Sequence, residues 1–197
     1  MTQPRASQPT FLRTWLVWTA GFLVFPVAGL AGTAVAGRVD SPMAALLGGL
    51  VAGLVLGAGQ ALVSRRRLDP RTWIPATTIG MGFGLLLGAL VVGYRTSLTD
   101  LAVMGAITGV ALGVAQAVAL PRRTRARWAW AVLMPALWAL GWVVSTLIPT
   151  TSVDAQFTIF GASGAFTFTA LSGLLLHRLL VYRPVAPPEP TPVRVTM

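Results

Sequence analysis

The sequence lacks several of the side chains on which catalysis and metal binding depend. Its 197 residues include no cysteine, a single histidine and five acidic residues, and they include no lysine. The absence of cysteine excludes disulfides, thiol catalysis and thiolate metal sites. The carboxylates are expected in loops or in the C-terminal tail, at Asp40, Asp69, Asp100, Asp154 and Glu189. We therefore predict no catalytic residue, no metal site and no bound cofactor, and we do not expect an enzyme.

Charge is scarce as well. Charged residues make up 10% of the chain and hydrophobic residues 55%, whereas a soluble domain carries about 25% charge. The mean hydropathy is +0.74. A membrane-crossing helix needs about 20 consecutive apolar residues, and six stretches fit, at 14–36, 42–63, 72–94, 101–120, 128–149 and 155–176. The sequence predicts an all-α integral membrane protein without charge at mid-membrane, which disfavours ion-coupled transport.

The basic residues of the chain are unevenly distributed. The formal net charge is +10 and all 15 basic residues are arginines, of which only Arg38 and Arg95 fall on the less basic side. This positive-inside pattern predicts a bacterial inner-membrane protein with both termini in the cytoplasm. The basic loops are expected to attract anionic lipid headgroups. A specific acidic partner is the alternative, and nucleic acid is not expected.

The two ends of the chain are predicted to form tails outside the membrane domain. Residues 1–10 are predicted to be a disordered polar tail, and residues 184–197 a disordered Pro-rich tail, with partner docking as the alternative for the latter. Arg5, Arg13 and the sequence Ala34-Val35-Ala36 flank the first apolar stretch like a signal peptide with its cleavage site. The stretch is longer than the usual apolar region of about 7–15 residues, so we expect it to be retained.

A motif of small residues returns after 56 residues. Gly49, Gly53, Gly57, Gln60 and Ala61 reappear as Gly105, Gly109, Gly113, Gln116 and Ala117, and a weaker third copy contains Gly161, Ala165, Thr169, Ser172 and Gly173. The repeat predicts three tandem two-helix hairpins, at 11–67, 68–123 and 124–183. Successive hairpins have the same orientation, so a pseudo-threefold axis along the membrane normal is expected.

Small residues in this register place close helix contacts on one helical face. Residues four apart lie on the same face, and small side chains let another backbone approach closely. We predict helix-packing roles for Gly49, Gly53, Gly57, Gly80, Gly84, Gly88, Gly105, Gly109, Gly113 and Gly161. Gln60, Gln116 and Ser172 share these faces, so they are expected to be buried. They are interpreted as hydrogen-bonding residues between helices, and a polar ring lining a solute path is the alternative.

The helices that open each hairpin begin with arginine and tryptophan. The three pairs are Arg13 and Trp15, Arg71 and Trp73, and Arg127 and Trp128. Arginine reaches headgroups while an indole favours the membrane interface. These six residues are predicted to be interface anchors, and a lipid or aromatic ligand box is the alternative.

Two resemblances accompany this pattern. Gly161-Ala162-Ser163-Gly164 resembles the serine motif of rhomboid intramembrane proteases, but the only histidine, His177, follows 14 residues later in the same predicted helix. That spacing corresponds to about 21 Å, which is beyond the hydrogen-bond reach that a serine and its base require. The repeat with paired arginines resembles a group of uncharacterised bacterial multi-span proteins over about 11–180. This resemblance implies the hairpin fold, and because the group has no assigned activity it adds nothing on function.

The functional hypothesis follows from these patterns. A membrane scaffold or accessory subunit, with another membrane protein or a second copy as partner, is favoured by the glycine faces, the basic loops and the scarcity of reactive groups. A small-solute facilitator along the pseudo-threefold axis is the alternative. An open centre would favour the facilitator, and a packed centre would favour the scaffold.

Overall fold

A computed structural model describes residues 11–64, 67–122, 124, 126–148 and 158–179 of the chain. The tails predicted at 1–10 and 184–197 lie outside these described residues. The first rod combines α1 (Phe11–Ala20), the 3-10 turn η1 (Gly21–Leu23) and α2 (Val24–Ala36). The remaining helices are α3 (Pro42–Val63), α4 (Pro70–Val92), α5 (Leu98–Ala119), α6 (Arg127–Leu147) and α7 (Ala162–Leu179).

Local sequence explains where the central helices begin. The side chains of Ser41, Asp69 and Ser97 accept hydrogen bonds from backbone N–H groups in the first turns of α3, α4 and α5. These are preferred N-cap residues. Proline follows the cap in α3 and α4, where its missing N–H costs nothing. At the other end of α4, Gly93 takes a left-handed conformation with φ of 60°, which glycine adopts without strain.

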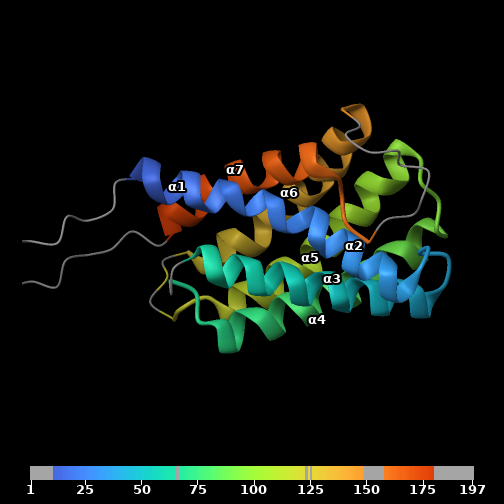
Figure 1. Cartoon of the computed structure of the whole chain (residues 1–197), viewed down its shortest axis with the longest axis horizontal. Coiled ribbons are helices and arrows are strands. Elements are labelled where there is room, and N and C mark those ends of the chain that lie inside the picture. The colour runs from blue at the N-terminus through green and yellow to red at the C-terminus, as the bar shows by residue number, and fades with distance from the viewer. Residues whose placement is uncertain (1–10, 65–66, 123, 125, 149–157, 180–197) are drawn as a thin grey trace, which may run out of the picture.

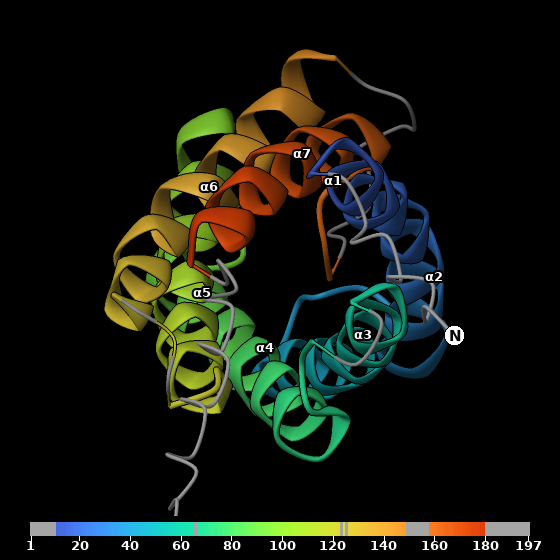
Figure 2. The ribbon, with the colours of Figure 1, turned by 90° about the vertical axis from the view of Figure 1, so that its left-hand side faces the viewer.

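The helices form a closed ring in chain order (Figures 1 and 2). The rod α1–α2 packs on α3, each later helix packs on the next, and α7 returns to pack on α1. Both described ends of the chain therefore lie at the same end of the ring. The rings of Phe11 and His177 are in contact there, with centroids 4.5 Å apart.

Five segments of the described chain are long and apolar enough to cross a membrane: Phe11–Ala36, Pro42–Val63, Pro70–Val92, Leu98–Ala119 and Arg127–Leu147. The all-helical, membrane-embedded fold expected from the sequence is therefore supported by the structure. The helix α7 is not among the five segments because serines, threonines, His177 and Arg178 lower its hydropathy.

The prediction that the last helix begins at residue 155 is wrong within the described residues. Thr158–Phe160 are not helical, and α7 begins at Ala162. Gly161 disfavours continuation of a helix. Thr158, Ile159 and Phe160 are each buried, so packing against the bundle replaces helical structure in this segment.

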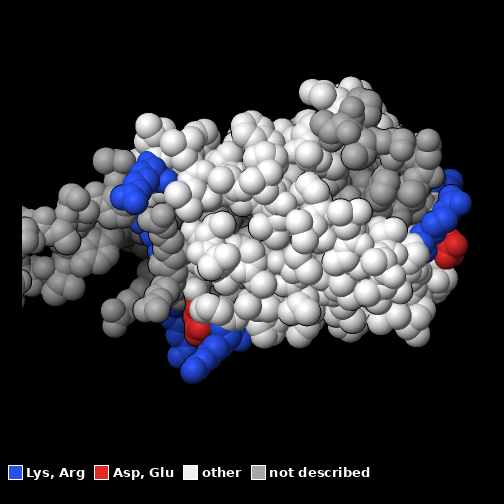
Figure 3. Space-filling model, viewed as in Figure 1, with Lys and Arg blue, Asp and Glu red and all other residues white. Residues whose placement is uncertain are grey.

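Charged side chains are confined to the two ends of the molecule. Every charged residue of the described chain lies in a connection or in the first or last turn of a helix. The space-filling view shows basic residues at both ends and a wide uncharged belt between them (Figure 3). Large apolar side chains are exposed on this belt, among them Leu30, Leu62 and Val132. Such a surface suits the hydrocarbon region of a bilayer.

Candidate functional site

Glycine stripes bring three successive pairs of helices into backbone contact. A Cβ atom added at Gly53 would lie 2.8 Å from the carbonyl oxygen of Thr77 in α4. At Gly109 it would lie 2.6 Å from Cα of Pro135 in α6, and at Gly84 it would lie 2.9 Å from Cα of Thr108 in α5. An added Cβ atom would also lie 2.5–3.0 Å from the nearest atom of the neighbouring helix at Gly49, Gly57, Gly80, Gly88, Gly105 and Gly113. The spaces therefore admit glycine and exclude larger residues.

The third copy of the motif is placed differently. Gly161 lies just before α7, where its carbonyl oxygen accepts hydrogen bonds from the Ala165 N–H and the Ser145 hydroxyl. Gly164 packs against the backbone of Gly141 in α6, and Gly173 packs against Trp18 in α1. The helix α7 therefore contacts both of its neighbours through glycine.

The two glutamines belong to one buried hydrogen-bond network inside the ring. Gln60 Oε1 accepts hydrogen bonds from Trp73 Nε1 at 3.0 Å and from Gln116 Nε2 at 3.3 Å. Gln116 Nε2 also donates to Thr77 Oγ1 at 3.0 Å, and Gln116 Oε1 accepts from Trp130 Nε1 at 3.0 Å. Gln60 and Gln116 come from α3 and α5, which α4 separates in the ring. Their contact therefore passes beside α4, whose Thr77 belongs to the same network.

Ser172 makes the corresponding contact in the third copy. Its hydroxyl oxygen accepts a hydrogen bond from Trp18 Nε1 at 3.1 Å. In each copy, then, the polar residue at the repeat position accepts from an indole on the next rod of the ring. Sequence reasoning identified the three acceptors but missed Trp18 and Trp130 as donors. Trp18 and Trp130 are 112 residues apart, which is two repeat steps, and this spacing could have indicated that they have the same role.

The prediction that Trp73 anchors the membrane interface is wrong. Its indole is fully buried and is in ring contact with Trp130, with centroids 6.1 Å apart. Burial of the indole excludes contact with headgroups. Trp128, in contrast, is 51% exposed and stacks with Arg127, while Trp15 is half-buried and donates to the Ala170 carbonyl oxygen. Arg13 and Arg71 are exposed near the starts of α1 and α4.

Aromatic side chains fill the interior towards the opposite end of the ring. Phe160 is in ring contact with Phe25 of α2, Trp138 and Trp142 of α6, and Phe168 of α7. We call these five residues the aromatic cluster. The segment that carries Phe160 also wedges Thr158 against Gly32 and Gly48, and Ile159 against Gly29. The connection into α7 thus closes this part of the ring.

The residues of the rhomboid-like sequence are used for packing and local hydrogen bonds. Ser163 Oγ donates to the Ile148 carbonyl oxygen at 2.8 Å, while His177 lies in the last turn of the same helix. The described residues contain no group of three or more metal-binding side chains.

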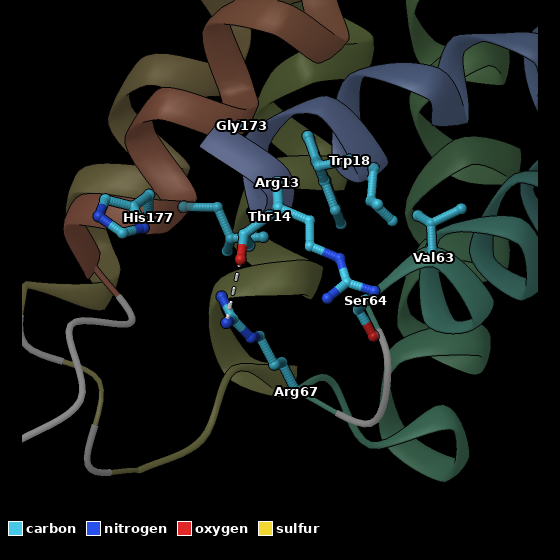
Figure 4. A pocket seen from close by; sticks show the side chains of 10 residues that line it. Arg13, Thr14, Trp18, Val63, Ser64, Arg67, Gly173 and His177 are labelled. Atoms are coloured by element: carbon cyan, nitrogen blue, oxygen red, sulfur yellow. Dashed lines mark hydrogen bonds between the residues drawn. The ribbon is translucent and has the colours of Figure 1, made fainter. Parts of the chain in front are cut away.

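A cleft of about 170 Å³ opens between α1, α3 and α7 at the end of the ring where α1 begins and α7 ends (Figure 4). Its polar lining consists of Arg13, Thr14, Ser64, Arg67 and His177. Its apolar walls include Val17, Trp18, Val63 and Leu176. We call this feature the basic cleft. The sequence pattern does not indicate this cleft, because the cleft depends on the spacing between α1 and α3 in the folded ring.

Comparisons with known proteins return no matching family, no matching curated protein and no matching solved structure. The resemblance to bacterial hairpin-repeat proteins therefore stays a prediction.

Proposed function

We propose that the protein is a non-enzymatic scaffold or accessory subunit of a bacterial inner membrane. In this proposal six helices cross the bilayer and both termini are cytoplasmic. The end of the ring where α1 begins and α7 ends faces the cytoplasm; it holds the described arginines other than Arg38 and Arg95, and we call it the basic end. The partner is another membrane protein or a second copy of the chain. The packed interior of the ring is the observation that carries the proposal.

The interior is filled at two levels along the ring. At the basic end, the glutamine network links α3, α4, α5 and α6 through buried side chains. Towards the other end, the aromatic cluster joins α2, α6 and α7. The polar groups of the glutamine network are paired with one another and have little capacity left to replace the hydration of a passing solute. This packing favours a scaffold over a facilitator.

We also propose that the three hairpins are arranged about a pseudo-threefold axis. The stripe of α3 packs on α4 and the stripe of α5 packs on α6. In the same relation α7 packs on α1, through Gly173 against Trp18 and through Thr169 Oγ1 donating to the Thr19 carbonyl oxygen. The recurring relation between a motif helix and the next rod supports this symmetry.

Flux through proteoliposomes separates the two functions. Liposomes containing the purified protein should pass glycerol and urea at the rate of protein-free liposomes, because the paired side chains leave no path. Saturable flux that disappears in the Gln60→Leu/Gln116→Leu double variant would establish the facilitator. Ala58→Leu on the exposed face of α3 is the matched control, because it adds bulk outside the ring.

Crosslinking in native membranes tests the scaffold directly. A photo-reactive residue is placed in turn at Leu30, Leu62 and Val132, which are exposed on α2, α3 and α6. A scaffold should give a product of constant mass from one face of the ring and only lipid adducts from the others. Lipid adducts alone from every face, in membranes that contain the protein at its native level, would contradict the proposal.

A further inference from the structure

The basic cleft combines two guanidinium groups with apolar walls. Arg13 lies on α1 and Arg67 follows α3, so the two charges enter the cleft from opposite sides (Figure 4). The Arg67 Nη2 donates to Thr14 Oγ1 at 3.4 Å across the mouth of the cleft. Among the residues that line it in the described chain, none is acidic.

Arg13 and Arg67 form no ion pair within the described residues. Two like charges that face one cleft repel each other, and an anion placed between them would relieve the repulsion. Arginine suits a phosphate group because its fork of N–H donors matches the phosphate oxygens. The hydroxyl of Thr14 adds a neutral hydrogen-bonding group beside the charges, whereas the Ser64 hydroxyl donates to the Ala61 carbonyl oxygen. The polar lining therefore has the chemistry of a phosphate site.

The apolar walls favour an amphiphile over a free ion as the ligand of the cleft. Val17, Trp18 and Leu176 continue the cleft away from the arginines. Leu16 and Leu62 stand next in sequence to the lining residues Val17 and Val63, and they are 51% and 80% exposed. The flanks of the cleft are therefore surrounded by lipid once the belt is embedded. A volume of about 170 Å³ is smaller than the roughly 300–1,000 Å³ that encloses a drug-sized ligand, so it fits a headgroup and the start of its chains.

We propose that the basic cleft binds the phosphate headgroup of an anionic phospholipid. Arg13 and Arg67 hold the phosphate, while the first carbons of the acyl chains lie along Val17 and Trp18. The site faces the basic end of the ring, where anionic lipids meet helix ends in membrane proteins. The assignment does not depend on the scaffold function, because a facilitator with this cleft would bind the same lipid.

Native mass spectrometry of the full-length protein in detergent tests the site. Phosphatidylglycerol should bind more tightly than phosphatidylcholine with the same acyl chains. The Arg13→Gln/Arg67→Gln variant should weaken phosphatidylglycerol binding by about tenfold or more, as expected for lost charge-assisted hydrogen bonds. The matched control is Arg71→Gln/Arg127→Gln, which removes the same charge from the same end of the ring outside the cleft. Equal loss in the two variants would overturn the site.

A second variant keeps the charges and fills the apolar wall. Val17→Trp should weaken phosphatidylglycerol binding by about tenfold while both arginines remain, and unchanged binding would contradict the proposed acyl-chain path. Inorganic phosphate distinguishes the two sources of the anion. Phosphate at millimolar concentration should leave bound phosphatidylglycerol in place. If phosphate displaces the lipid and binds the Val17→Trp variant as well as the parent, the cleft is a site for free anions.

Discussion

The two tryptophans at the start of α6 differ in their surroundings. Trp128 is 51% exposed, whereas Trp130 is fully buried. Residues two apart on a helix point about 200° apart around its axis. Only Trp130 can therefore face the ring interior, where its indole N–H reaches Gln116.

We predict that Trp130→Phe destabilises the protein by about 1–3 kcal/mol, because Gln116 Oε1 is then left without its buried donor. Phenylalanine is smaller than tryptophan, so a small cavity at this fully buried position adds to the cost of the lost hydrogen bond. The measurement is unfolding in mixed micelles with increasing SDS. Trp128→Phe is the control and should change stability by less than about 0.5 kcal/mol. Equal effects of the two substitutions would show that the hydrogen bond has no special importance.

The contact faces of α3 and α5 were predictable at the level of elements because they follow from covalent geometry. Small residues at intervals of four fall on one face whatever the surroundings. The burial of Trp73 was not predictable in the same way. Arg71 and Trp73 have the composition of an interface pair, but tertiary packing sets the rotation of α4 and places Gln60 beside the indole. Thr158–Phe160 were likewise predicted as part of an apolar helix, and their non-helical structure depends on packing inside the ring.

Substitutions on the glycine faces of α3 and α5 test whether these faces are tight contacts. Gly53→Leu and Gly109→Leu should each lower stability by about 1–3 kcal/mol, because the new side chains meet backbone atoms of α4 and α6. Thermal unfolding in detergent measures the effect. Ala58→Leu adds bulk to the exposed face of α3 and should leave the melting temperature nearly unchanged. If Gly53→Leu and Ala58→Leu have the same melting temperature, the stripe is not a tight contact in the detergent-solubilised protein.

At the scale of the whole molecule, closure of the ring constrains the topology. The first rod contributes the buried side chains Trp18 and Phe25 to the interior. Removing residues 1–36 as a signal peptide would therefore open the ring and expose Ser172 and Phe160, the partners of those two side chains. We therefore predict that the first rod is retained. The expected intact mass of the membrane form includes residues 1–36, and a mass that lacks them would show cleavage.

The contact between Phe11 and His177 favours an even number of membrane crossings. Five crossings would leave the start of α1 and the end of α7 on opposite faces of the membrane, yet these two rings lie 4.5 Å apart. We therefore expect α7 to cross as the sixth helix despite its lower hydropathy, supported by hydrogen bonds of its hydroxyls to backbone carbonyls such as Thr169 to Ala165. Reporter fusions at Arg67, Arg123 and after Arg178 should read cytoplasmic, and fusions at Asp40 and Thr151 periplasmic. A periplasmic signal after Arg178 with a cytoplasmic signal at Arg67 would mean that α7 does not cross and that the ring does not close in the membrane.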